Sequence, residues 1–145
     1  MALHLTLGDG NVGYLVGAGL ALSVSLMATL LGLDRDRAFY PTIMIVIASY
    51  YGLFAVMGGS VQILALESIA IVASLAAAIA GFKRSLWLVV ASLAAHGVYD
   101  LGHGQLITNP GMPLWWPAFC SAFDLVAAAY LAWLLSRSKV RAAAT

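Results

Sequence analysis

Charged side chains are scarce in this chain of 145 residues, because Asp, Glu, Lys and Arg together make up only 9% of it. In soluble globular proteins about a quarter of the residues are charged. Hydrophobic residues make up 63% of the sequence, more apolar surface than a water-soluble core of this size could hide. The composition therefore excludes an ordinary soluble domain and favours an integral membrane protein.

Cysteine is almost absent as well. The single residue Cys120 excludes an internal disulfide and a metal cage built from several thiolates, and we expect it to pack as a small apolar side chain. The net charge is +1 and the basic residues are confined to short connecting segments, so the electrostatic footprint of a nucleic-acid-binding protein is missing. We expect no nucleic-acid partner.

Five apolar runs are each close to the ~20 residues that a helix needs to cross a bilayer. Nothing alternates with period two, and isolated strands would leave backbone groups unpaired in lipid, so a strand interpretation fails. The sequence predicts an all-α protein, a single membrane domain over residues 1–145 with five transmembrane helices at about 12–33, 39–58, 60–82, 86–103 and 117–135.

No Lys or Arg lies in the outer half of this arrangement. Five spans place all the basic residues on one face, which the positive-inside rule makes cytoplasmic. The N-terminus is then outside and the C-terminus inside, in a multi-pass protein of the cell membrane. His4 and Asp9 would be solvated at the outer end of the first span. The basic residues are Arg35, Arg37, Lys83, Arg84, Arg137, Lys139 and Arg141.

Five ionisable residues are expected at a similar depth in the outer half. Glu67 and Asp124 each lie roughly 10 Å below the outer end of their helices, at 1.5 Å per residue. His96, Asp100 and His103 are spaced by four and three residues and therefore share one face of the fourth helix. Ionisable residues at such depth normally face the bundle interior or a cavity, and are functional by default.

Three arrangements would neutralise these acids without a Lys or Arg. The carboxyl groups are protonated, or they pair with charged histidines, or they bind a cation. The mixture of imidazole and carboxylate favours the third, a divalent metal such as zinc. We expect Glu67 or Asp124 to act as general base, and segment 104–116 to lie over the mouth of the site beside His103. The expected metal ligands are His96, Asp100, His103, Glu67 and Asp124.

Three classes of function follow from this pattern. The first is a metal-dependent intramembrane enzyme, for example a hydrolase, acting on a membrane lipid or another apolar small molecule. The second is a proton- or cation-coupled carrier or channel, which the apolar inner halves of the five spans place behind the first. The third is an accessory subunit whose polar residues only fix helix packing. A homo-oligomer is compatible with each of them.

Overall fold

The computed structural model describes residues 2–141, with side chains from Asn11 onward, so His4 and Asp9 lie outside the described side chains. It contains five α-helices and a single turn of 3-10 helix, and no β-strand occurs in residues 2–141. The all-α prediction is confirmed. The elements are α1 (Ala2–Leu31), η1 (Leu33–Arg35), α2 (Phe39–Met57), α3 (Val61–Lys83), α4 (Trp87–Leu106) and α5 (Trp116–Ser136).

Four of the helices are long and apolar enough to cross a membrane: α2, α3, α5 and the part of α1 from Asn11 to Leu31. The ends of α2 to α5 lie within three residues of the predicted ranges. Helix α1 begins at Ala2, ten residues before the predicted start at Val12, because polar residues do not interrupt a helix whose backbone hydrogen bonds continue. Helix α4 has 20 residues, but His96, Asp100 and His103 make it less apolar than the others.

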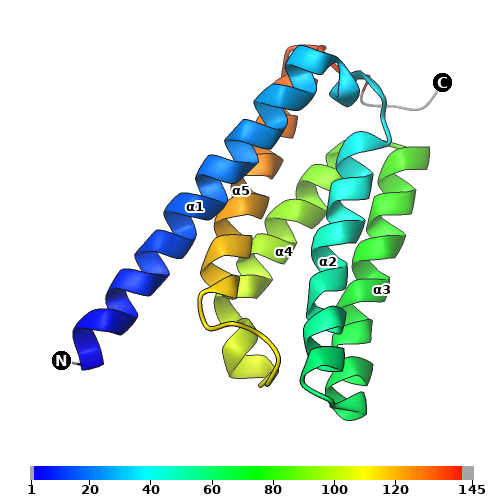
Figure 1. Ribbon diagram of the computed structural model, residues 1–145. Helices are drawn as coiled ribbons and strands as arrows, with labels where there is room; N and C mark the ends of the chain where they lie inside the picture. The colour runs from blue at the N-terminus through cyan, green and yellow to red at the C-terminus, as the bar shows by residue number, and fades with distance from the viewer. Residues whose placement is uncertain (1, 142–145) are drawn as a thin grey trace.

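Helix α1 lies at one side of the bundle, next to α5, followed by α4 and then by the pair α2 and α3 (Figure 1). Helix α1 lies along α5, α5 along α4, and α2 along α3, while α3 and α2 both contact α4. Helices α1 and α2 are consecutive in the chain but hardly touch each other away from η1. The close contact of α1 with α5 needs Gly17, since a Cβ atom there would overlap the backbone of Phe119.

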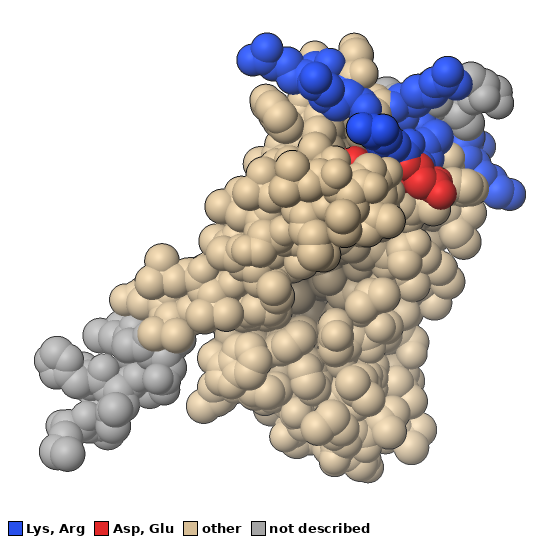
Figure 2. Space-filling model, turned by 45° about the horizontal axis from the view of Figure 1, so that its top comes forward, with Lys and Arg blue, Asp and Glu red and all other residues tan. Residues whose placement is uncertain are grey.

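The basic residues gather at one end of the bundle, which we call the basic end (Figure 2). Helices α1, α3 and α5 finish there, and α2 and α4 begin there (Figure 1). Arg37 ties this end together, because its guanidinium donates to the carbonyl oxygens of Gly81 and Phe82 in the last turn of α3 and of Arg141 in the tail. The opposite end carries the connection between α4 and α5, residues 107–115, and we call it the loop end.

An apolar core fills the interior on the side of the basic end. Met44, Ala48, Val89, Leu93 and Leu131 are almost completely buried there and come from α2, α4 and α5. The buried acids and histidines of α3, α4 and α5 lie on the loop-end side of this core.

Candidate metal centre

A histidine held between two carboxylates lies where α4 meets α5. His96 Nδ1 is 2.7 Å from Asp124 Oδ2 on α5 and 3.5 Å from Asp100 Oδ2, one turn further along α4. The first contact is a hydrogen bond and the second is an ion-pair distance only. All three side chains are buried.

Gly97 allows this contact because it lets the two helix backbones approach. A Cβ atom at position 97 would lie 3.1 Å from the carbonyl oxygen of Ser121 and 3.2 Å from Cβ of Asp124. Small residues at helix crossings in membranes commonly have this role. The side chain of His96 therefore reaches Asp124 directly, with no larger residue between the helices.

Tyr51 of α2 connects this group to the rest of the interior. Its hydroxyl donates to Asp100 Oδ1 at 2.5 Å, and its ring stacks on the imidazole of His103, with centroids 4.0 Å apart and an angle of 16° between the planes. The side chain is only 1% exposed. Tyr51 therefore fixes the direction of one carboxylate and of one histidine at the same time.

Cys120 completes a group of four residues whose donor atoms can surround one ion. One atom from each of His96, Asp100, Cys120 and Asp124 lies within 4.8 Å of the others. Cys120 is one helical turn before Asp124 on α5, so both side chains are on the same face. We call these four residues the ligand cluster.

Glu67 and His103 form a separate pair nearer the loop end. His103 Nε2 lies 2.9 Å and 3.1 Å from the two carboxylate oxygens of Glu67, and both side chains are fully buried. Asn109, in the segment between α4 and α5, donates from Nδ2 to Glu67 Oε1 at 2.9 Å and to the carbonyl oxygen of Tyr51 at 3.0 Å. The segment therefore covers the pair and is fixed to it.

With both of its aspartates ionised, the ligand cluster carries an unbalanced negative charge. Asp100 and Asp124 share one imidazole, which carries at most one positive charge, and each ion pair found among the described residues involves a histidine. Asp100 Oδ2 and Asp124 Oδ1 are also buried without a hydrogen-bond partner. Buried acceptors without a donor are rare in folded proteins, and a proton, a water molecule or a cation accounts for such atoms.

The donor set suits a divalent transition metal. Imidazole nitrogen, carboxylate oxygen and thiolate sulfur are the ordinary ligands of zinc, and four of them can form a tetrahedral site. Calcium and magnesium prefer oxygen ligands, so the imidazole nitrogen and the sulfur of this cluster suit them poorly. The residues present therefore fit zinc or a related metal.

The structure divides the five predicted metal ligands into two groups. His96, Asp100 and Asp124 converge in the ligand cluster, whereas Glu67 and His103 bind each other beside the ring of Tyr51. His103 was expected at the mouth of the site, but it is completely buried because residues 107–115 lie over it and insert Asn109. Of the two predicted catalytic acids, only Asp124 belongs to the cluster.

Sequence reasoning missed the positions of four residues in and around the candidate site. Cys120 was expected to be a small packing residue, although its spacing of four from Asp124 places it on the same helix face. Tyr51 and Asn109 are not among the predicted ligands, and only the structure reveals the contacts of Tyr51 with Asp100 and of Asn109 with Glu67. Gly97 carried no signal of its own beyond its position next to His96.

Comparisons with protein-family models, with curated proteins and with solved structures find no match to this chain.

Proposed function

We propose that this protein is a multi-pass enzyme of the cell membrane, built as a single membrane domain, that uses a divalent metal ion to act on a lipid or another apolar substrate. One observation carries the proposal: the ligand cluster contains two buried carboxylates, one imidazole and two carboxylate oxygens without a partner. A divalent cation would supply the missing positive charge and bind both free oxygens. Zinc suits the donor set best.

Each polar residue has a role in this proposal. His96, Asp100 and Asp124 hold the ion, and Cys120 is a fourth ligand or lies beside an open position. A bound metal acidifies water and polarises a carbonyl or phosphoryl oxygen, which suits hydrolysis. Of the two acids considered as a general base, Asp124 is the better placed, because it belongs to the ligand cluster while both carboxylate oxygens of Glu67 are bonded to His103. Glu67 is a positioning residue that acts through His103 and Tyr51.

The membrane arrangement in the proposal has five spans, with the N-terminus outside and the C-terminus cytoplasmic. The four apolar helices support it, together with the grouping of Lys and Arg at the basic end (Figure 2). Helix α4 is the fifth span because its polar side chains are buried against α2, α3 and α5 instead of facing lipid. The ligand cluster then lies in the outer half of the bilayer.

Elemental analysis of the purified protein tests the proposal. We expect one equivalent of metal in the wild type, none in His96→Ala, and an unchanged content in Ser121→Ala, which alters a buried polar residue next to the ligand cluster that has no hydrogen-bond partner. All three proteins are compared by size-exclusion chromatography and thermal unfolding, so that a misfolded variant is recognised. Absence of metal from the wild type, also after incubation with zinc, would overturn the proposal.

Whether Cys120 binds the metal decides between a catalytic and a structural metal site. A structural zinc binds four protein ligands, whereas a catalytic zinc keeps one position open. If Cys120 is a ligand, cobalt-substituted protein shows a sulfur-to-cobalt charge-transfer band that Cys120→Ser abolishes. We expect no such band, and full metal content in Cys120→Ser, because the enzyme needs the fourth position for water or substrate. A strong band would favour a structural site.

A proton- or cation-coupled carrier is the second candidate, and the run of buried polar groups from Asn109 to Asp124 favours it. The apolar core beyond Asp124, formed by residues such as Met44 and Leu131, interrupts this run on the side of the basic end. The enzyme therefore comes first. Metal-free protein that transports protons in liposomes, with transport abolished by Asp124→Asn, would reverse that order.

A further inference from the structure

A groove of about 440 Å³ lies between α1 and α2, with α5 as its floor. It exists because these two helices hardly touch, while α1 is held closely against α5. Leu20 and Val24 form one wall, Val46 and Ile47 the other, and Phe123 part of the floor. The lining is therefore almost wholly hydrocarbon.

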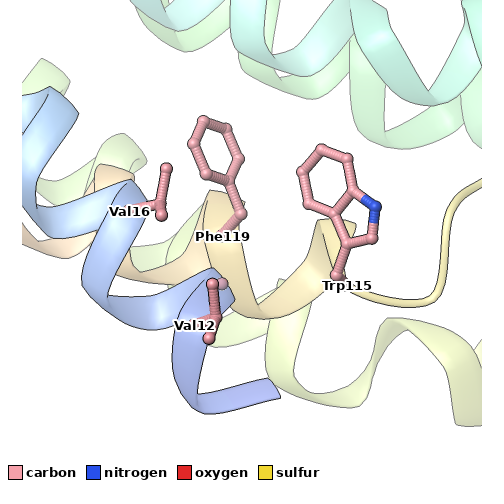
Figure 3. A pocket seen from close by; sticks show the side chains of 5 residues that line it. Val12, Val16, Trp115 and Phe119 are labelled. Carbon is pink, nitrogen blue, oxygen red and sulfur yellow. The ribbon is translucent and has the colours of Figure 1, made fainter. Parts of the chain in front are cut away.

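The groove opens sideways onto the surface formed by the apolar helices. Leu20 and Val46, on its two rims, are each close to half exposed, at 45% and 46%. A smaller hollow of about 360 Å³ lies beside it, between α1 and the first turns of α5 (Figure 3). Phe119 borders both spaces, so apolar surface continues from the loop end into the groove.

One residue in the floor of the groove, Cys120, also belongs to the ligand cluster. Cys120 lines the groove, and its sulfur lies within 4.8 Å of donor atoms of His96, Asp100 and Asp124. A molecule in the groove would therefore contact Cys120, the side chain that borders both the groove and the atoms to which we assign the metal.

We infer that this groove holds the hydrocarbon chain of a membrane lipid, and that this lipid is the substrate whose polar group meets the metal beside Cys120. The inference rests on the proposed function and names its substrate class. A water-soluble ligand would find few polar partners on these walls.

The groove alone does not select its occupant, because lipid tails are as apolar as its walls and gain nothing from the transfer. Selection comes from the polar group that reaches the ligand cluster. Lipid chains should therefore occupy the groove more often than they contact other lipid-facing surfaces of the protein.

A phospholipid with a photoactivatable diazirine on one chain, close to the ester group that joins the chain to the polar headgroup, tests this in nanodiscs, with the labelled residues identified by mass spectrometry. We expect labelling to concentrate on residues 119–123 of α5 and to exceed labelling of Ile69 and Val72, which are exposed on α3. Val46→Trp and Val24→Trp, on opposite walls, should abolish the labelling of residues 119–123. Ile69→Trp, a control outside the groove, should leave it unchanged.

Metal content measured on the same samples separates this inference from the proposed function. Uniform labelling, or labelling that both groove variants leave intact, overturns the groove even if metal is present. Concentrated labelling of a protein that binds no metal keeps the groove as a lipid site and overturns its link to metal chemistry. Concentrated, variant-sensitive labelling of a metal-containing protein supports both.

Discussion

At the scale of single residues, a substitution of Asp124 tests whether the ligand cluster binds a metal or only joins the helices. Asp124→Asn keeps the size of the side chain and removes one of two carboxylates that share a single imidazole. We expect the variant to lose the metal and, measured without metal, to change its free energy of unfolding by no more than about 0.6 kcal/mol. The substitution removes a buried negative charge that is not neutralised, which is favourable, and it weakens the hydrogen bond to His96, which is unfavourable. The two effects offset each other.

Metal content and thermal unfolding, with and without a chelator, measure both effects. Ser121→Ala is the matched control, because its buried hydroxyl next to the cluster has no hydrogen-bond partner. A chelator-treated Asp124→Asn protein that unfolds far more easily than chelator-treated wild type would indicate a structural contact instead.

Tyr51 should tune the metal without binding it. Tyr51→Phe keeps the ring on His103 and removes the hydroxyl that donates to Asp100. Outer partners of metal ligands typically change affinity by about 10- to 100-fold, and we expect a loss in this range. Competition with a chelator measures the affinity. Tyr50→Phe is the control, since the ring of Tyr50 packs on Trp116 and Phe54 instead; an equal loss there would contradict the assigned role.

At the scale of helices, the contact of α1 with α5 depends on one glycine. Gly17→Ala places a methyl group against the Phe119 backbone, which should destabilise the protein by about 1–3 kcal/mol. Gly19→Ala is an internal control, because no atom lies within 4 Å of the added Cβ; it should be neutral or stabilise α1 by up to ~1 kcal/mol. Thermal unfolding in detergent compares the two. Equal effects would mean that α1 does not pack on α5 as described.

The helices themselves could be predicted from the sequence because each is a long apolar run bounded by charged or turn-forming residues. The start of α1 could not, since hydropathy reports the part of a helix that suits lipid and not where the backbone begins to coil. The lateral order of the helices was also beyond prediction. It depends on close approaches at Gly17 and Gly97, which depth and helical phase do not reveal.

The sequence predicted most of the residues of the candidate site, but not that they form two separate groups, the ligand cluster and the Glu67–His103 pair. Spacing along α4 correctly placed His96, Asp100 and His103 on one buried face. Equal depth then suggested one common site, but equal depth says nothing about direction around the bundle axis. The ring of Tyr51 stacks on His103, and His103 pairs with Glu67 of α3. His96 instead faces α5 and bonds to Asp124.

At the scale of the whole molecule, we expect one orientation in the membrane, with the N-terminus outside and the C-terminus inside. It places the basic end in the cytoplasm and the ligand cluster in the outer half of the bilayer. A reporter active only in the cytoplasm should work at the C-terminus and fail at the N-terminus, because the basic residues of the basic end are retained inside. A reporter active only outside should give the reverse pattern. Activity of one reporter at both termini would mean that both termini lie on the same side of the membrane. The chain could then not have five spans, and the ligand cluster could no longer be assigned to the outer half of the bilayer.

Tyr51 also connects the two ends of the polar region through its hydrogen bonds. Its hydroxyl binds Asp100 and its carbonyl oxygen accepts from Asn109, so the cluster and the segment over Glu67 contact the same residue. Linkage is reciprocal: if closure of that segment strengthens metal binding, the metal strengthens closure by the same factor. Added zinc should then slow amide hydrogen exchange in residues 107–115. A covering loop would in this way report, at the membrane surface, whether the buried centre is filled.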